Sequence, residues 1–131
     1  MSKKKILVVD DEPGFVEMIK MRLEDNDYKV VTAADGAEGI EKISSEKPDA
    51  VLLDILMPGL DGIEALKRIR KHNKELPVFI VTAFSSEERF EEAKKHNVSG
   101  FIVKTSDLKQ EVGNITNALN MASHYKGKKK D

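Results

Sequence analysis

Five short apolar segments, separated by stretches with helical periodicity, restrict the possible folds of this chain more than any other feature. Each segment is rich in Val and Ile and mostly lacks the polar alternation of a half-exposed strand. Each is therefore predicted to be a strand buried on both faces, as in a parallel sheet. The segments are Ile6–Val9, Lys29–Ala33, Ala50–Leu53, Val78–Val81 and Gly100–Val103.

The intervening stretches are predicted to be amphipathic helices. Pro13 stands where a first helical turn tolerates proline, and Asp35 with Glu38 has the spacing of a capping box. Ser85 with Glu88 repeats that spacing before the fourth helix, which is mostly charged. The apolar positions are Phe15, Met18, Ile19 and Leu23, then Ile40 and Ile43, then Ile63, Leu66 and Ile69, then Phe90 and Ala93, and finally Leu108, Val112, Ile115, Leu119 and Ala122.

This alternation predicts a (βα)5 chain, an α/β fold with a doubly wound, five-stranded parallel sheet of the flavodoxin-like type. The common strand order for such a sheet is 2-1-3-4-5, and its ligand crevice lies at the carboxyl ends of strands 1 and 3. We expect one domain over residues 1–125 and a basic, disordered tail over residues 126–131.

Composition excludes several classes of protein. The 22 Lys and Arg residues nearly balance the 23 Asp and Glu residues, which argues against direct nucleic-acid binding. The absence of Cys excludes disulfides and thiolate metal sites. No apolar run is long enough for a secretion signal or a membrane span, so we expect a cytoplasmic protein without membrane contact.

Polar residues follow four of the predicted strands. Asp10 and Asp11 end the first and Asp54 ends the third, so three carboxylates should meet in the crevice. Packed carboxylates repel one another, and a hard cation such as Mg2+ relieves the repulsion. Thr82 and Lys104 end strands 4 and 5. A metal, a hydroxyl and a lysine around one carboxylate can accept and neutralise a phosphoryl group.

These strand ends, with the residues around them, resemble the receiver domain of bacterial two-component response regulators, the family that includes the chemotaxis switch protein. The resemblance extends from about Lys4 to Leu119, nearly the whole chain. The matching segments are ILVVDDEP at 6–13, DAVLLDILMPGLDG at 49–62, PVFIVTA at 77–83 and GFIVK at 100–104.

The resemblance implies a role for each site residue. Asp54 would be the phosphoacceptor, and Asp10 and Asp11 would build the Mg2+ pocket. The main-chain carbonyl of Leu56 would be a further ligand beside Asp11 and Asp54. Thr82 and Lys104 would bind the phosphoryl oxygens, with Thr82 also taking part in the switch.

The chain departs from the family pattern at two positions. Thr105 follows Lys104 where many relatives have proline after a cis peptide; a trans bond is expected here, because a non-proline cis bond costs about 2.5–4 kcal/mol. Phe101 matches the switch aromatic but lacks the hydroxyl of the common Tyr.

Leu56 and Phe84 stand two positions after Asp54 and Thr82, where a side chain can orient the hydrolytic water. Both are bulky and apolar, which predicts slow autodephosphorylation.

The expected function is a phosphorylation-activated switch of a two-component phosphorelay. The chain would accept a phosphoryl group from a histidine kinase or phosphotransfer protein, by self-catalysed transfer rather than enzyme turnover. It would signal through the face of helix 4, strand 5 and helix 5, to a protein partner or a missing output domain, as a monomer or a phosphorylation-dependent homodimer.

Three other functions fit the residues less well. A flavodoxin-like electron carrier conflicts with the acidic loop after strand 1, because that loop would repel the flavin phosphate. A haloacid-dehalogenase-type phosphatase needs an acid two residues after its nucleophile, and Leu56 stands there instead. A degenerate receiver that binds partners without phosphorylation would not need the site residues, and all five are present.

Overall fold

The computed structural model contains the predicted five-stranded parallel sheet, in the order β2-β1-β3-β4-β5. It describes residues 4–55, 61–82 and 87–103, together with residues 113, 117 and 119. The strands are β1 (Lys5–Val9), β2 (Lys29–Ala33), β3 (Ala50–Leu53), β4 (Val78–Thr82) and β5 (Gly100–Val103). The helices of the described ranges are α1 (Pro13–Asp25), α2 (Gly36–Glu46), α3 (Gly62–His72) and α4 (Glu87–Lys94). Fold class and strand order are confirmed.

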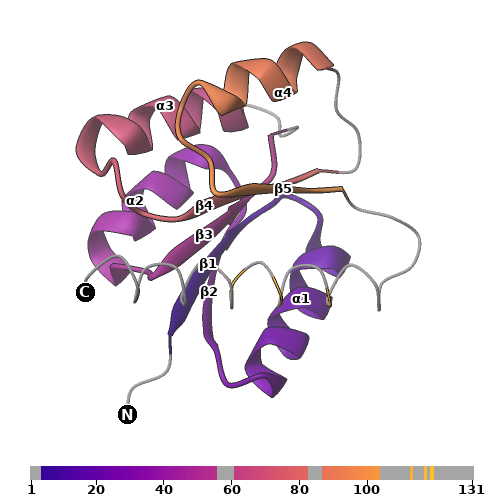
Figure 1. Ribbon diagram of the computed structural model, residues 1–131. Helices are drawn as coiled ribbons and strands as arrows, with labels where there is room; N and C mark the ends of the chain where they lie inside the picture. Colours follow the sequence, from indigo (N-terminus) through magenta and orange to yellow (C-terminus); the bar gives the residue numbers. More distant parts are fainter. Residues whose placement is uncertain are drawn as a thin grey trace, which may run out of the picture.

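Helices cover both faces of the sheet, because successive strand residues point to opposite sides. Leu7 and Val9 of β1 pack into a core cluster with α2, α3 and α4. Ile6 and Val8 pack into a second cluster with α1 and with Leu119. Figure 1 shows α2, α3 and α4 on one side of the sheet and α1 on the other. The continuous apolar runs are thus explained by burial on both faces.

The helix starts agree with the sequence signals wherever they are described. Pro13 is in the first turn of α1. Asp35 caps α2 by accepting a hydrogen bond from the Glu38 amide at 2.8 Å. The Glu38 carboxylate accepts from the Ala34 amide at 2.8 Å, and this hydrogen bond lowers the pKa of Glu38. The reciprocal cap therefore reaches one residue further back than a standard capping box.

Some predicted features involve residues that the structure does not describe. These features are Ser85 as the cap of α4, most of the fifth predicted helix, and the tail 126–131. Gly113, Asn117 and Leu119 are described and are helical. None of the helices in the described part of the chain has the length and apolar character needed to span a membrane.

Arg70 joins the end of α3 to the turn after α4. Its side chain is buried, and burial lowers the pKa of its guanidinium. Nε donates to the carbonyl of His96 at 2.9 Å, Nη1 to that of Asn73 at 3.0 Å, and Nη2 to that of Asn97 at 2.7 Å. This one side chain therefore satisfies carbonyls from two loops.

We expect the Arg70→Ala variant to lose about 3 kcal/mol of unfolding free energy, because three main-chain carbonyls lose the charged donor that a buried side chain supplies. Denaturant unfolding followed by circular dichroism measures the loss. Arg68→Ala, at an exposed position of the same helix, should change stability by less than about 0.5 kcal/mol. Equal losses in the two variants would contradict this account.

Candidate functional site

The sheet register brings Asp10 and Asp54 together at the carboxyl ends of β1 and β3. Val9 pairs with Leu53, and the amide of Asp54 donates to the carbonyl of Val9 at 3.0 Å. The two carboxylates therefore follow directly after neighbouring strands. Asp10 is 3% exposed and Asp54 is 4% exposed. Burying two carboxylates side by side is costly unless a cation or hydrogen bonds compensate.

A third carboxylate joins this pair. Oxygens of Asp10, Glu12 and Asp54 lie within 4.8 Å of one another. Such a set of carboxylate oxygens suits a hard divalent cation, and Mg2+ characteristically uses one or two carboxylates and keeps several waters. All three donors are carboxylate oxygens, so the donor chemistry fits Mg2+, and two of the three residues are buried.

Asp11, the predicted metal ligand next to Asp10, is exposed and is not a member of this group. The third member is Glu12, which is also exposed and was given no role in the sequence-based prediction. The Glu12 amide donates to Oδ1 of Asp10 at 2.9 Å, and the backbone at Glu12 is extended. Side chains two apart share a face of an extended chain, and this spacing of two was the signal available in the sequence.

Gly62, the first residue of α3, lies against the backbone that carries Asp54. A Cβ at this position would lie 2.4 Å from the Asp54 carbonyl oxygen and 2.4 Å from the Ile55 Cα. Both atoms belong to the main chain, so a side chain would have to displace the backbone itself. Glycine therefore allows the start of α3 to approach Asp54 this closely.

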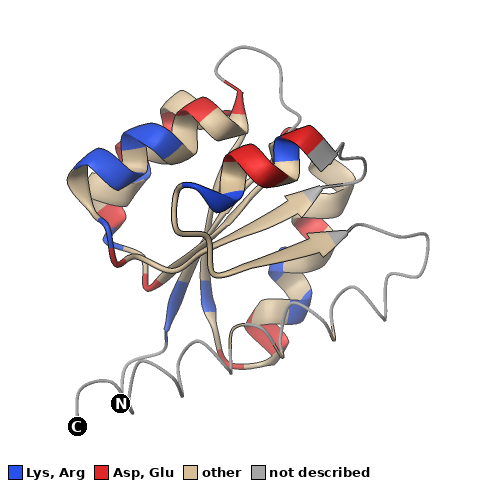
Figure 2. Cartoon of the chain, turned by 45° about the horizontal axis from the view of Figure 1, so that its top comes forward, with Lys and Arg blue, Asp and Glu red and all other residues tan. Residues whose placement is uncertain are grey.

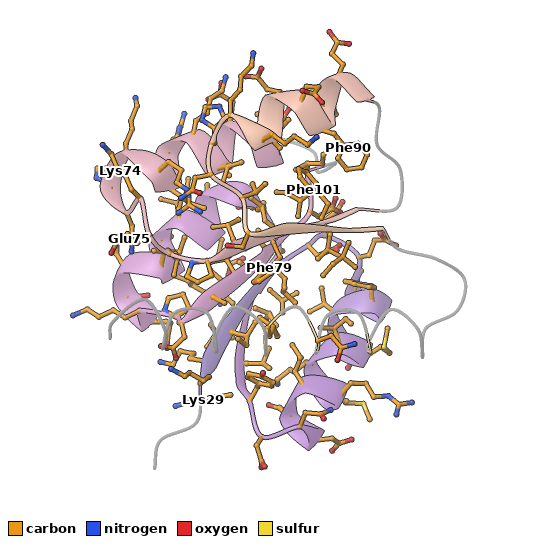
Figure 3. All side chains as sticks on the ribbon, viewed as in Figure 1. Lys29, Lys74, Glu75, Phe79, Phe90 and Phe101 are labelled. Atoms are coloured by element: carbon orange, nitrogen blue, oxygen red, sulfur yellow. The ribbon has the colours of Figure 1, made fainter. Side chains whose placement is uncertain are left out.

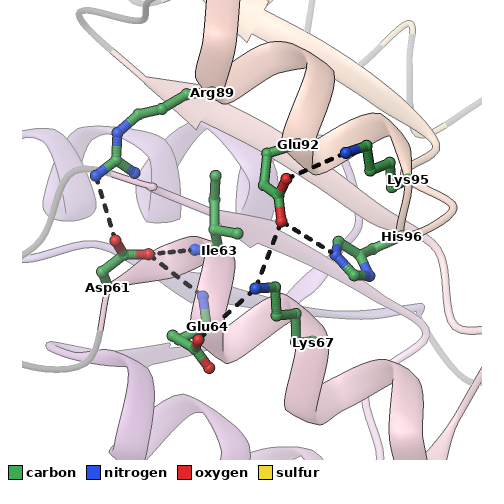
Figure 4. A network of polar contacts seen from close by, with 8 residues as sticks. All are labelled: Asp61, Ile63, Glu64, Lys67, Arg89, Glu92, Lys95 and His96. Carbon is green, nitrogen blue, oxygen red and sulfur yellow. Dashed lines mark hydrogen bonds and ion pairs between the residues drawn. The ribbon is translucent and has the colours of Figure 1, made fainter.

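Asp61 caps the same end of α3. Its Oδ1 accepts hydrogen bonds from the amides of Ile63 at 2.7 Å and Glu64 at 3.3 Å. Its Oδ2 pairs with Arg89 of α4 at 3.2 Å (Figure 4). Asp61, the last residue before α3, thus binds both α3 and α4 through its side chain.

The remaining predicted residues are only partly described. Thr82 ends β4, and its main chain pairs with Val103 of β5, the residue before Lys104 in the sequence. The side chain of Thr82 and the residues Leu56, Phe84 and Lys104 lie outside the described residues. The Lys104–Thr105 peptide also lies outside them, so its isomer stays a prediction.

Phe101 is partly buried and packs on the core cluster shared by α2, α3 and α4. Its ring meets that of Phe90 edge to face, with centroids 4.9 Å apart and planes at 84°. Figure 3 shows these two rings close together, between α4 and β5. The predicted switch aromatic therefore contacts α4 directly, through an apolar pair that needs no hydroxyl.

Comparison with known proteins agrees with this geometry. A family model described as the response regulator receiver domain matches residues 6–116. PhoP, the alkaline phosphatase synthesis transcriptional regulatory protein of Bacillus subtilis, is 45% identical over 84 residues, which are 64% of this chain and 35% of PhoP. The response regulator MprA of Mycolicibacterium vanbaalenii is 43% identical over 82 residues, covering 63% of this chain and 36% of MprA. The matches thus span about a third of each relative's length.

Solved structures give the same result over the whole domain. The response regulator domain of Thermotoga maritima CheB is 32% identical, with a TM-score of 0.83, and the match covers 92% of this chain and 96% of that domain. Vibrio cholerae CheY4 is 29% identical, with a TM-score of 0.81, and the match covers 89% of this chain and 99% of CheY4. Since the family model spans most of the sequence and these relatives are of the same kind, the chain belongs to the response regulator receiver domain family.

Proposed function

We propose that this chain is a Mg2+-dependent phosphorylation switch that carries its phosphoryl group on Asp54. The observation that carries the proposal is the buried carboxylate of Asp54 beside Asp10, at the switch point of the sheet. Receiver domains serve two-component signalling, which supports a histidine kinase or phosphotransfer protein as the donor. A cytoplasmic location is part of the same proposal and rests on family membership.

The reaction places a phosphoryl group on a carboxylate oxygen. An oxygen of Asp54 forms a bond to phosphorus, the bond between phosphorus and the donor imidazole nitrogen breaks, and the imidazole leaves as the neutral ring after taking up a proton. Asp54 then carries an acyl phosphate. The residues proposed here for the phosphoryl oxygens are Thr82 and Lys104, whose hydroxyl and ammonium groups donate hydrogen bonds.

The proposed metal pocket contains Asp10, Asp11, Asp54 and the main-chain carbonyl of Leu56, with Glu12 as an added carboxylate. When bound, Mg2+ supplies positive charge that neutralises the incoming phosphoryl group. The chain's own contribution is to keep these oxygens together and partly out of water, which strengthens each electrostatic contact.

The direct test is incubation with acetyl phosphate, a small phosphodonor, in the presence of Mg2+. We expect mass spectrometry to show one added phosphoryl group per chain. Hydroxylamine should remove it, because an acyl phosphate reacts with hydroxylamine whereas a phosphoserine ester does not. No uptake by the folded protein in saturating Mg2+ would exclude the proposed function.

We expect Asp11→Ala and Glu12→Gln each to weaken Mg2+ binding, because each removes negative charge at the pocket. Asp11→Ala should in addition nearly abolish labelling, as expected for a direct ligand. Glu12→Gln should weaken binding by about three- to tenfold, about 0.7–1.4 kcal/mol, through its charge alone. A titration followed by amide NMR measures both effects.

Glu17→Gln, an exposed substitution on α1, is the matched control and should leave the Mg2+ affinity unchanged. If Asp11→Ala binds Mg2+ as well as the wild type while Glu12→Gln does not, the pocket is built from Asp10, Glu12 and Asp54 alone.

We expect slow dephosphorylation, because the side chains of Leu56 and Phe84 are apolar and cannot hydrogen-bond the hydrolytic water, and because both are bulky. Replacing Leu56 by Asn and Phe84 by Glu should accelerate phosphate release about tenfold, a barrier change of about 1.4 kcal/mol. Release of phosphate from labelled protein measures the rate. Rapid decay of the wild type, unaltered by the double substitution, would disprove this explanation.

The output of the switch is proposed to be the face of α4, β5 and the helix after it, towards a protein partner or an output domain outside this chain. PhoP is by name a transcriptional regulator, and this chain aligns with only 35% of it. The prediction that the chain does not bind nucleic acid directly therefore applies to this domain and is untested for any longer protein. A monomer or a phosphorylation-dependent homodimer remains the proposed state.

A further inference from the structure

Arg89 of α4 contacts both ends of the stretch that leads from Asp54 to α3. Its Nη1 lies 3.4 Å from the carbonyl oxygen of Ile55, the residue after Asp54. Its Nη2 lies 3.2 Å from Oδ2 of Asp61, the capping residue of α3. A guanidinium has a planar fork of donors that reaches two such acceptors from two different nitrogens, whereas all three donors of a lysine lie on one nitrogen.

Two independent contacts therefore hold the backbone next to the proposed phosphoacceptor. Gly62 packs against the Asp54 carbonyl and the Ile55 Cα. Arg89 reaches the Ile55 carbonyl from a helix that lies 34 residues further along the chain. Ile55 itself is fully buried, so its main chain has little room to move. A change in the position of Arg89 would thus displace the main chain at Ile55, one residue after Asp54.

The Asp61 carboxylate combines two tasks. One oxygen receives the Ile63 and Glu64 amides, and the other receives Arg89 (Figure 4). All three hydrogen bonds are charge-assisted, because the Asp61 carboxylate is their acceptor. The start of α3, the backbone after Asp54 and the side chain of Arg89 therefore form one connected unit.

Helix α4 has other attachments that do not reach this unit. Lys67 of α3 pairs with Glu92 of α4 at 3.4 Å, and Phe90 packs on Phe101. The ribbon of Figure 2 is coloured for acidic residues over much of α4 and for basic residues over much of α3, in line with this ion pair. The Lys67–Glu92 pair joins the same two helices as the Arg89–Asp61 pair. It therefore offers a control that separates docking of α4 in general from the contact with Ile55.

We propose that Arg89 is a positioning residue for the phosphoacceptor site: it fixes the main chain at Ile55 relative to Asp61, and so couples the place of α4 to the geometry around Asp54. The inference rests on the proposed function of Asp54. Because coupling between two sites is reciprocal, Mg2+ bound near Asp54 favours the arrangement in which Arg89 holds both acceptors, and that arrangement favours Mg2+.

The test compares Arg89→Ala with Lys67→Ala in the complete chain. Mg2+ affinity is measured by amide NMR titration, and the rate of Asp54 labelling is measured with acetyl phosphate. Arg89→Ala should weaken Mg2+ binding and slow labelling by about three- to tenfold each. Lys67→Ala should leave both within twofold of the wild type, which is the expected scatter for a contact that does not reach the site. Thermal unfolding of each variant reports whether it is folded.

Two further variants distinguish positioning from a structural role. Arg89→Lys should recover only part of the lost affinity, because Arg89 reaches the two acceptors from two different nitrogens, whereas lysine has a single nitrogen. Asp61→Asn retains an oxygen for the Ile63 and Glu64 amides but loses the charge that pairs with Arg89. Adding Asp61→Asn to Arg89→Ala should therefore weaken Mg2+ binding little beyond the Arg89→Ala value. If Arg89→Ala does not fold, Asp61→Asn alone should show the same loss of affinity.

Wild-type Mg2+ affinity and labelling in folded Arg89→Ala would overturn the inference, as would an equal loss in Lys67→Ala. Neither result would affect the assignment of Asp54. Conversely, a wild-type chain that takes up no phosphoryl group would overturn the proposed function itself, whatever the Arg89 variants do.

Discussion

Replacing Asp54 by asparagine should abolish uptake of the phosphoryl group from acetyl phosphate, because the amide oxygen is a far weaker nucleophile than the carboxylate. Among the described carboxylates, Asp54 and Asp10 are the buried ones, and Asp54 directly follows the central strand β3. Mass spectrometry of the intact chain should show no added phosphoryl group after an incubation that labels the wild type fully.

The same substitution should stabilise the folded chain when Mg2+ is removed. Asp10, Glu12 and Asp54 bring their oxygens within 4.8 Å of one another, and removing one charge relieves the repulsion. We expect a gain of about 1 kcal/mol in unfolding free energy in the presence of a chelator. Asp25→Asn, at an exposed position of α1, is the control and should change neither labelling nor stability. Labelling of Asp54→Asn at the wild-type rate would show that another residue accepts the phosphoryl group.

Replacing Gly62 by alanine should destabilise the fold by about 3 kcal/mol, because the new methyl group would overlap main-chain atoms that cannot rotate away. The nearest of these atoms are the Asp54 carbonyl oxygen and the Ile55 Cα, each 2.4 Å from the added Cβ. Displacement of this backbone also moves the phosphoacceptor, and misplacement of about 1 Å can cost about a hundredfold in rate. Denaturant unfolding and the rate of acetyl phosphate labelling measure the two effects.

Gly14→Ala is a matched control for that experiment. Gly14 also lies in the first turn of a helix, α1, but a Cβ there meets nothing within 4 Å. Alanine loses less backbone entropy than glycine on folding, so Gly14→Ala should stabilise the chain by about 0.5–1 kcal/mol. Opposite signs for the two substitutions are the expected result. A Gly62→Ala chain as stable and as reactive as Gly14→Ala would contradict the described approach of α3 to Asp54.

The sheet and its strand order were predictable because their signals are local. Uninterrupted apolar runs such as Val51–Leu53 require burial on both faces, and the helical periodicity between runs requires crossovers, which leaves few topologies. The same reasoning placed Asp10 and Asp54 at adjacent strand ends, and the register of β1 against β3 confirms that placement. Asp35 was predictable as a helix cap for the same reason, since a cap and its amide are three residues apart.

The details of the site were not predictable in this way. The strand ends predicted that Asp11 lies in the crevice with Asp10 and Asp54, and the resemblance added its role as a metal ligand. In the structure Glu12 is the carboxylate whose oxygens lie near those of Asp10 and Asp54, and Asp11 and Glu12 are both exposed. Which of these two carboxylates lies near Asp10 and Asp54 depends on how the chain leaves β1 and enters α1. That path is set by the packing of the whole helix α1, and it cannot be predicted from Asp11 and Glu12 alone.

The sequence by itself determined the elements, their alternation and the strand ends at which the acids collect, because hydrophobic periodicity and strand length act over a few neighbouring residues. Only the tertiary structure decided that Gly62 lies against Asp54, and that Arg89 reaches Ile55 across 34 residues. Such contacts arise where two helices pack on one sheet face. The residues that meet there depend on the packing of side chains distant in sequence, which no local sequence pattern predicts.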